Sequence, residues 1–153
     1  MFILDFIFRN KPWLIKKTIN DDTFGLMWFN KDQDPVFDHF QAHITFRPTN
    51  SEIDVFIDSD KNGIDPRQKT FFKEIETKYS ECIRKSIRPI EEFLKNKNNQ
   101  NTQITNFEEE FTLIIISIPR DISQKWSLSF SSEKYSLYDL TINFIKWDII
   151  EIA

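Results

Sequence analysis

A short acidic stretch has the residue types and spacing closest to a known chemical site. Asp58, Asp60 and Asn62, with a glycine next, match the first half of an EF-hand calcium loop. The twelfth position of such a loop is a bidentate glutamate, but here it is Lys69, whose ammonium would repel the ion. We therefore predict a structural turn between a strand and a helix. The alternative is a calcium or other divalent-metal site, in an enzyme or a binding module, made by Asp58, Asp60, Asn62 and Asp65.

The histidines and the cysteine offer weaker chemistry. His39 and His43 have the spacing of a helical zinc pair, but their segment alternates like a strand. At about 3.3 Å per residue their Cα atoms would lie about 13 Å apart, too far for one zinc ion. Cys82 is the single cysteine and falls on an apolar helical stripe beside Ile83, where a thiol is inert when buried. We expect no zinc site and no cysteine nucleophile.

Composition excludes several enzyme classes. The chain has two glycines, whereas phosphate-binding loops, dinucleotide fingerprints and nucleophile elbows need several close together. Glu76-Thr77-Lys78 has the form of a nuclease signature, but it lies on a predicted helix, where a solvated charged face is the better interpretation. We expect no catalytic residues and no cofactor.

Charge is unevenly distributed along the chain. The net charge is −4, and residues 21–60 hold nine acidic residues against Lys31 and Arg47. Clustered carboxylates attract basic partners, and aromatic residues such as Trp28 and Phe37 could supply an interface core. Nucleic acid is not an expected partner, because the basic residues of the predicted helix alternate with glutamates. The candidate partner-binding residues are Asp21, Asp22, Asp32, Asp34, Asp38 and Asp54.

Period-two alternation of apolar residues predicts a strand-rich chain. It suits a mainly antiparallel sheet of about six to eight strands, with turns made by Asn, Asp and Pro. The predicted strands are Phe2–Phe8, Trp13–Ile19, Thr23–Phe29, His39–Arg47, Ile53–Asp58, Phe111–Ile118, Lys125–Ser131 and Leu140–Ile149.

One long helix is predicted to pack on this sheet, which gives an α+β fold. Asp65, Pro66 and Gln68 have the order of an N-cap, a first helical residue and a capping-box partner. Three-and-four spacing then predicts an inward face of Phe72, Ile75, Tyr79 and Ile83. Proline removes a helical hydrogen bond, so Pro89 predicts a kink or a break near Arg88.

The chain, 153 residues long, is expected to form one domain over residues 1–153. The polar segment Lys95–Asn106 is expected to be a mobile loop. The apolar N-terminus is interrupted by Asp5 and lacks a preceding basic region, unlike a signal peptide, and no apolar run is long enough to span a bilayer. We expect a cytoplasmic protein with no membrane anchor.

The order of these features carries a resemblance. It rests on Thr23–Phe29, Ile53–Asp58, Pro66–Gln68 with the helix that follows, Trp126–Phe130 and Leu140–Trp147. This order resembles small, largely uncharacterised bacterial α+β proteins, some encoded beside polymorphic toxins and regarded as immunity proteins. The resemblance covers about residues 23–150 and implies a non-enzymatic protein that inhibits a cognate toxin by occlusion, with no catalytic residues to carry over. The toxin would be basic and could act on nucleic acid.

Overall fold

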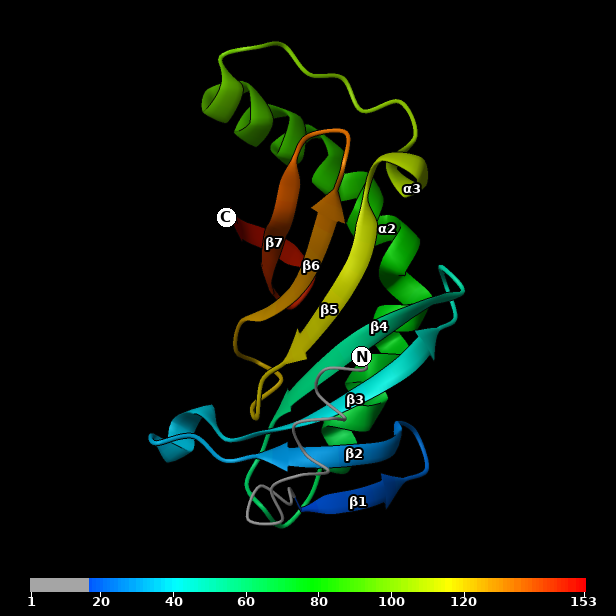
Figure 1. Cartoon of the computed structure of the whole chain (residues 1–153), viewed down its shortest axis with the longest axis vertical. Coiled ribbons are helices and arrows are strands. Elements are labelled where there is room, and N and C mark those ends of the chain that lie inside the picture. Colours follow the sequence, from blue (N-terminus) through cyan, green and yellow to red (C-terminus); the bar gives the residue numbers. More distant parts are fainter. Residues whose placement is uncertain (1–16) are drawn as a thin grey trace, which may run out of the picture.

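The computed structural model of the chain describes residues 17–153, and its strands form one sheet in chain order (Figure 1). Neighbouring strands are antiparallel, except that β4 and β5 are parallel and are joined through the long helix α2. The described part is therefore a mixed α/β structure in which strands dominate. The strands are β1 (Thr18–Asp21), β2 (Gly25–Asn30), β3 (His39–Phe46), β4 (Ser51–Asp58), β5 (Thr112–Ile118), β6 (Trp126–Ser132), β7 (Leu137–Ile145) and β8 (Asp148–Ile152).

The start of α2 (Pro66–Asn98) is confirmed at the predicted residue. The Asp65 carboxylate accepts the N–H of Arg67 at 2.8 Å, and the Gln68 side chain accepts the N–H of Asp65 at 3.1 Å. Gln68 is buried and its amide also donates to the carbonyls of Asp58 and Pro119, both at 2.9 Å. The capping box thus ties the helix to the ends of β4 and β5.

Of the predicted kink or break near Arg88, the break is wrong, because α2 continues through Pro89 to Asn98. Its 33 residues correspond to about 50 Å at 1.5 Å per residue. A proline inside a helix costs about 3 kcal/mol. Ser86 and Ile90, on either side of Pro89, are fully buried, and we attribute the continuity of the helix to this packing. Figure 1 shows the helix running past the sheet and turning across it toward its C-terminal end.

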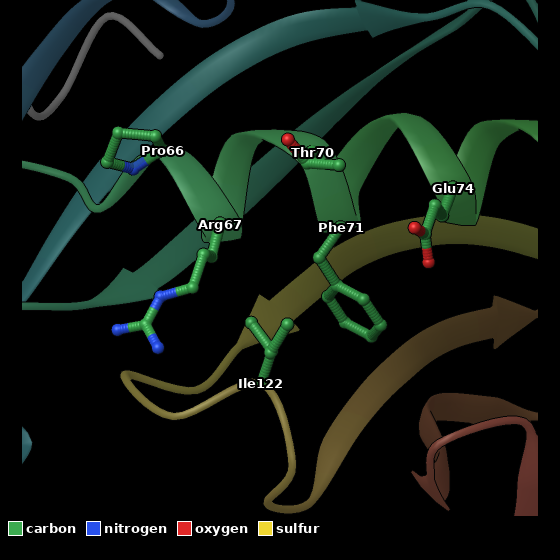
Figure 2. A pocket seen from close by; sticks show the side chains of 6 residues that line it. All are labelled: Pro66, Arg67, Thr70, Phe71, Glu74 and Ile122. Carbon is green, nitrogen blue, oxygen red and sulfur yellow. The ribbon is translucent and has the colours of Figure 1, made fainter.

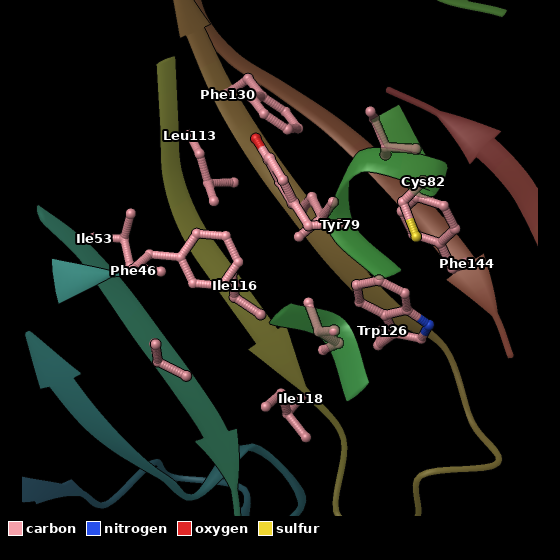
Figure 3. Packing of buried hydrophobic residues seen from close by; sticks show 14 of the residues in the cluster. Phe46, Ile53, Tyr79, Cys82, Leu113, Ile116, Ile118, Trp126, Phe130 and Phe144 are labelled. Atoms are coloured by element: carbon pink, nitrogen blue, oxygen red, sulfur yellow. The ribbon is translucent and has the colours of Figure 1, made fainter. Parts of the chain in front are cut away.

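Residues of α2 belong to the same apolar cluster as the strands (Figure 3). The four residues predicted to face inward, from Phe72 to Ile83, are all buried. Phe72 lies edge-on to Phe24 at 5.0 Å between ring centroids, and Tyr79 lies edge-on to Phe46 at 5.2 Å. Aromatic contacts between distant segments therefore form much of the core, as the high phenylalanine content suggests.

The last predicted strand, Leu140–Ile149, is wrong, since the chain reverses within it to form β7 and β8. Lys146 takes a left-handed backbone conformation with φ of 53°. The indole N–H of Trp126 donates to the Lys146 carbonyl at 2.6 Å, and Trp147 packs at 5.5 Å from the Trp126 ring. Tertiary contacts stabilise this turn, so it carries none of the glycine or asparagine residues that would mark it in the sequence.

The predicted mobile loop at Lys95–Asn106 is partly helical and partly buried. Of the predicted loop Lys95–Asn106, residues 95–98 continue α2, and Ile104 is buried with its N–H donated to Glu91 at 2.8 Å. A short helix, α3 (Phe107–Glu110), follows and was not predicted. At the N-terminus, the strand at Phe2–Phe8 and most of Trp13–Ile19 lie outside the described residues, and β1 begins at Thr18.

Within residues 17–153, no helix combines the length and the apolar character needed to cross a membrane.

Candidate functional site

Two of the candidate carboxylates are used by the fold. The Asp21 side chain is 8% exposed; it accepts the N–H groups of Thr23 at 2.8 Å and Phe24 at 3.2 Å, and it pairs with Lys69 at 2.6 Å. Asp38 is buried, and its carboxylate accepts the N–H of Asp32 at 2.8 Å. Asp21 therefore shapes the β1–β2 turn, and Asp38 holds the start of β3. Neither Asp21 nor Asp38 is therefore available as part of a binding surface.

Asp22 and Asp54 are accessible but already paired. Asp22 lies 2.9 Å from Lys69, whose hydrogen bond and charge lower the pKa of this carboxyl group. Asp54 faces His43 across the β3–β4 pair, with 2.9 Å between its carboxylate and Nδ1. Glu52 lies 2.9 Å from Nε2 of the same ring, so both contacts are hydrogen bonds only when the imidazole carries both protons. Both carboxylates already have local partners and are less free to bind another molecule.

Asp32 and Asp34 lie on a loop that extends outward between β2 and β3. We name residues 31–38 the β2–β3 projection; it contains a 3-10 turn, η2 (Pro35–Phe37). Every residue from Lys31 to Phe37 is exposed. Val36 and Phe37 remain 69% and 61% exposed, which is unusual for a neighbouring pair of large apolar side chains. Figure 1 shows this loop reaching beyond the ends of the strands at one side of the molecule.

A series of side-chain to backbone hydrogen bonds shapes the projection. Asp38 accepts from the N–H of Asp32, Asp32 from that of Asp34 at 3.1 Å, and Asp34 from that of Val36 at 3.0 Å. Each carboxylate uses one oxygen, and the second oxygen of Asp32 and of Asp34 accepts no bond from residues 17–153. The loop is therefore held in one conformation while two carboxylates still face solvent.

The acidic turn considered for calcium directs its side chains to separate partners. Asp65 pairs with Arg67 at 2.7 Å, and the hydrogen bond from that guanidinium lowers the pKa of Asp65 to about 2. Asp60 accepts the N–H of Asn62 at 2.8 Å, and burial raises the pKa of Asp58. Among residues 17–153, no three His, Cys, Asp or Glu side chains are placed to hold a metal ion together.

The remaining sequence candidates also have local roles. His39 and His43 face Asp58 and Asp54 of β4 in the strand register. Cys82 is buried, and burial raises the pKa of its thiol to about 11. A thiol in this state is not a nucleophile at neutral pH.

A shallow hollow lies beside the first turns of α2 (Figure 2). Its volume is about 220 Å³, and its apolar wall is formed by Phe71 and Ile122. Arg67 extends away from that wall in Figure 2 and is paired with Asp65. No set of polar side chains converges inside the hollow, so it does not resemble an active site.

Sequence reasoning missed one buried carboxylate altogether. Glu110 accepts the N–H and the hydroxyl of Thr105 and the N–H of Asn106, each at 2.9 Å. It also accepts from Tyr135 at 2.5 Å and pairs with Lys134 at 2.9 Å. We call these five residues the Glu110 network. Burial raises the pKa of Glu110, but these hydrogen bonds and the lysine outweigh it and hold the pKa well below its usual range. No short sequence motif predicts the network, because its members come from two segments more than twenty residues apart.

Comparison of the chain with protein-family models, with curated proteins and with solved structures gave no match.

Proposed function

We propose that this chain is a non-enzymatic binding protein of the immunity type, which inhibits a basic cognate toxin in the bacterial cytoplasm by covering its working surface. The observation that carries the proposal is the β2–β3 projection. It combines two outward carboxylates, Asp32 and Asp34, with two exposed apolar side chains, Val36 and Phe37. Apolar anchors supply affinity at protein interfaces, whereas charges supply association rate and specificity.

The burial and ion pairs of the acidic residues in residues 21–60 indicate which of them can belong to a binding surface. Asp38 is buried, the side chain of Asp21 is 8% exposed and paired with Lys69, and Asp22 and Asp54 lie against Lys69 and His43. Among the acidic residues of this range, the exposed carboxylates that form no ion pair within residues 17–153 are Asp32 and Asp34 of the projection and Asp60. A partner with a positive surface would meet those of the projection before other parts of residues 21–60, because the projection extends beyond the strands.

The test pairs this chain with the protein encoded by the neighbouring gene, which the proposal expects to carry a toxin domain. We expect a stable complex that abolishes toxicity when the two are co-expressed. Asp32→Asn with Asp34→Asn keeps the local backbone hydrogen bonds, since asparagine also accepts them, but removes two charges. Stopped-flow association at 50 mM and 200 mM NaCl should be about tenfold slower for this variant at low salt.

The matched control removes two charges elsewhere. Glu92→Gln with Glu109→Gln changes two exposed glutamates outside the projection and has the same effect on net charge. Its association rate should stay within about twofold of wild type. If both variants slow association equally, net charge and not the projection steers the encounter. If no complex forms with the wild-type chain, the proposed function is wrong.

A further inference from the structure

A groove lies between the turn that follows β3 and the outer side of α2. Its volume is about 500 Å³, which falls within the range of about 300–1,000 Å³ found for small-molecule sites. Figure 1 shows this turn at the opposite end of β3 from the β2–β3 projection. We name it the β3–α2 groove, and the residues that line it are Arg47, Pro48, Lys73, Glu76, Thr77 and Ser80.

The helical wall of the groove presents an ammonium and a hydroxyl group. Lys73, Thr77 and Ser80 are four and three residues apart, so their side chains lie on the same side of α2. The Thr77 hydroxyl is used by the helix, because it donates to the Lys73 carbonyl at 3.0 Å. Within residues 17–153, the Lys73 ammonium and the Ser80 hydroxyl form no ion pair or hydrogen bond. Lys69, one turn earlier, pairs with two aspartates instead.

The opposite wall presents an oriented guanidinium. Nε and Nη2 of Arg47 each lie 3.4 Å from an oxygen of Glu76, whose side chain is only 13% exposed. A guanidinium has five N–H donors, and this pair uses one edge of it. Glu76 therefore positions Arg47 and leaves the edge formed by Nη1 and Nη2 available to bind an oxyanion in a bidentate manner.

The donors in the groove indicate the class of ligand. Two cations face one carboxylate there, so the groove is locally positive on a chain with a net charge of −4. A phosphate monoester has three acceptor oxygens, which matches one guanidinium edge, one ammonium and one hydroxyl, whereas a carboxylate has two oxygens. Pro48 and the aliphatic part of the Lys73 side chain offer apolar contact to an attached organic group.

We propose that the β3–α2 groove binds a small phosphate monoester, with the phosphate on Arg47, Lys73 and Ser80 and the organic group along Pro48. This inference does not depend on the proposed function, because it concerns a different surface and a different class of ligand.

Isothermal titration calorimetry of the full chain tests the ligand class. The probes are AMP and glucose 6-phosphate, with adenosine and glucose as their unphosphorylated counterparts and succinate as a dicarboxylate. At least one phosphate ester should bind saturably with a Kd below about 1 mM. Its unphosphorylated counterpart should give no saturable binding, and succinate should bind roughly tenfold more weakly or less.

Substitutions in the groove test the residues. Lys73→Gln and Arg47→Gln should each weaken binding of the ester by roughly tenfold or more, the usual effect of losing a hydrogen bond to a charged group. The matched control is Lys31→Gln, which removes one exposed positive charge near the other end of β3 and should change the Kd by less than about twofold. Circular dichroism melting of each variant checks that the fold is retained.

Four results would overturn the inference and leave the proposed function unaffected. They are no saturable binding of either ester up to about 10 mM, equal binding of succinate, an unchanged Kd in both groove variants, and an equal loss of affinity in Lys31→Gln. The last would show that net charge, and not the groove, attracts the ester.

Discussion

In both the Glu110 network and the β2–β3 projection, carboxylates accept backbone N–H groups and shape a loop. The carboxylate of the network is buried and paired, whereas those of the projection are exposed. Glu110 is buried and also binds a hydroxyl and an ammonium, which leaves its charge satisfied within the fold. Within residues 17–153, Asp32 and Asp34 each have one oxygen that accepts no hydrogen bond. The difference shows that backbone capping alone does not distinguish a structural carboxylate from one available to a partner.

The largest effect should come from a carboxylate placed in the core without partners. Ile83 is buried on α2, and Ile83→Asp would place a carboxylate there without a partner. The buried carboxylate of Glu110, in contrast, is bonded by five groups. This should cost several kcal/mol, a large part of the 5–15 kcal/mol typical of a domain, and leave the chain largely unfolded at 25 °C by circular dichroism. Arg84→Asp, at the next and exposed position, is the control and should remain folded. A folded Ile83→Asp variant would show that the inward face of α2 is misassigned.

Removal of the Glu110 carboxylate should be the next most damaging change. Glu110→Ala leaves the N–H groups of Thr105 and Asn106 and the Tyr135 hydroxyl without their acceptor, at a cost of about 3 kcal/mol in chemical denaturation. The same truncation at exposed Asp34 should cost about 1 kcal/mol, the typical effect of losing a cap. Equal losses at the two sites would remove the distinction between the two regions.

The depressed pKa of Glu110 gives this network a pH dependence. Because the folded pKa lies below the ordinary value of 4.5, the ionised carboxylate stabilises the fold fully above pH 4.5. That contribution is lost as the pH falls further toward the folded pKa. Glu110→Gln should therefore flatten the loss of stability on acidification below pH 4.5, whereas Glu109→Gln should leave it unchanged.

A smaller effect is expected where a buried polar atom lacks a partner. Among residues 17–153, the hydroxyl of Tyr79 is buried and accepts or donates no hydrogen bond, in contrast to every oxygen of the Glu110 side chain. Burial also raises the pKa of this phenol well above its usual range. Tyr79→Phe should raise the unfolding free energy by about 1 kcal/mol, measured by urea denaturation. A loss of stability would show that the hydroxyl is hydrogen-bonded in solution.

The smallest effect on stability should come from the tip of the projection. Val36→Ser with Phe37→Ser removes side chains that pack against little of the fold, so the unfolding free energy should change by less than about 0.5 kcal/mol. Phe40→Ser, three residues further along and fully buried, should cost at least about 3 kcal/mol. A large loss in the tip variant would mean that Val36 and Phe37 are part of the core and not a binding surface.

The sequence predicted the features that depend on neighbours along the chain. The start of α2 follows from Asp65, Pro66 and Gln68, which act within one helical turn. Strands β3 and β4 lie within a residue or two of their predicted bounds, because strict alternation persists over eight residues in each. The β7–β8 reversal was missed, since the turn at Lys146 depends on Trp126, twenty residues earlier.

The candidate site was predicted in composition but not in arrangement. Residues 21–60 were identified as acidic, yet local sequence cannot tell buried Asp38 from exposed Asp34. A phenylalanine is normally assigned to the core, so the exposure of Phe37 could be found only by placing every neighbouring element.

By itself, the sequence determined the helix cap, the alternation of the strands, the scarcity of glycine that excludes phosphate-binding loops, and the excess of negative charge in residues 21–60. Only the tertiary structure determined which carboxylates are bonded within the fold and which are exposed to solvent. The physical reason is that capping and periodicity act over a few residues, whereas burial and ion pairing depend on groups brought together from distant parts of the chain. Lys69 reaches Asp21 in this way, and Tyr135 reaches Glu110.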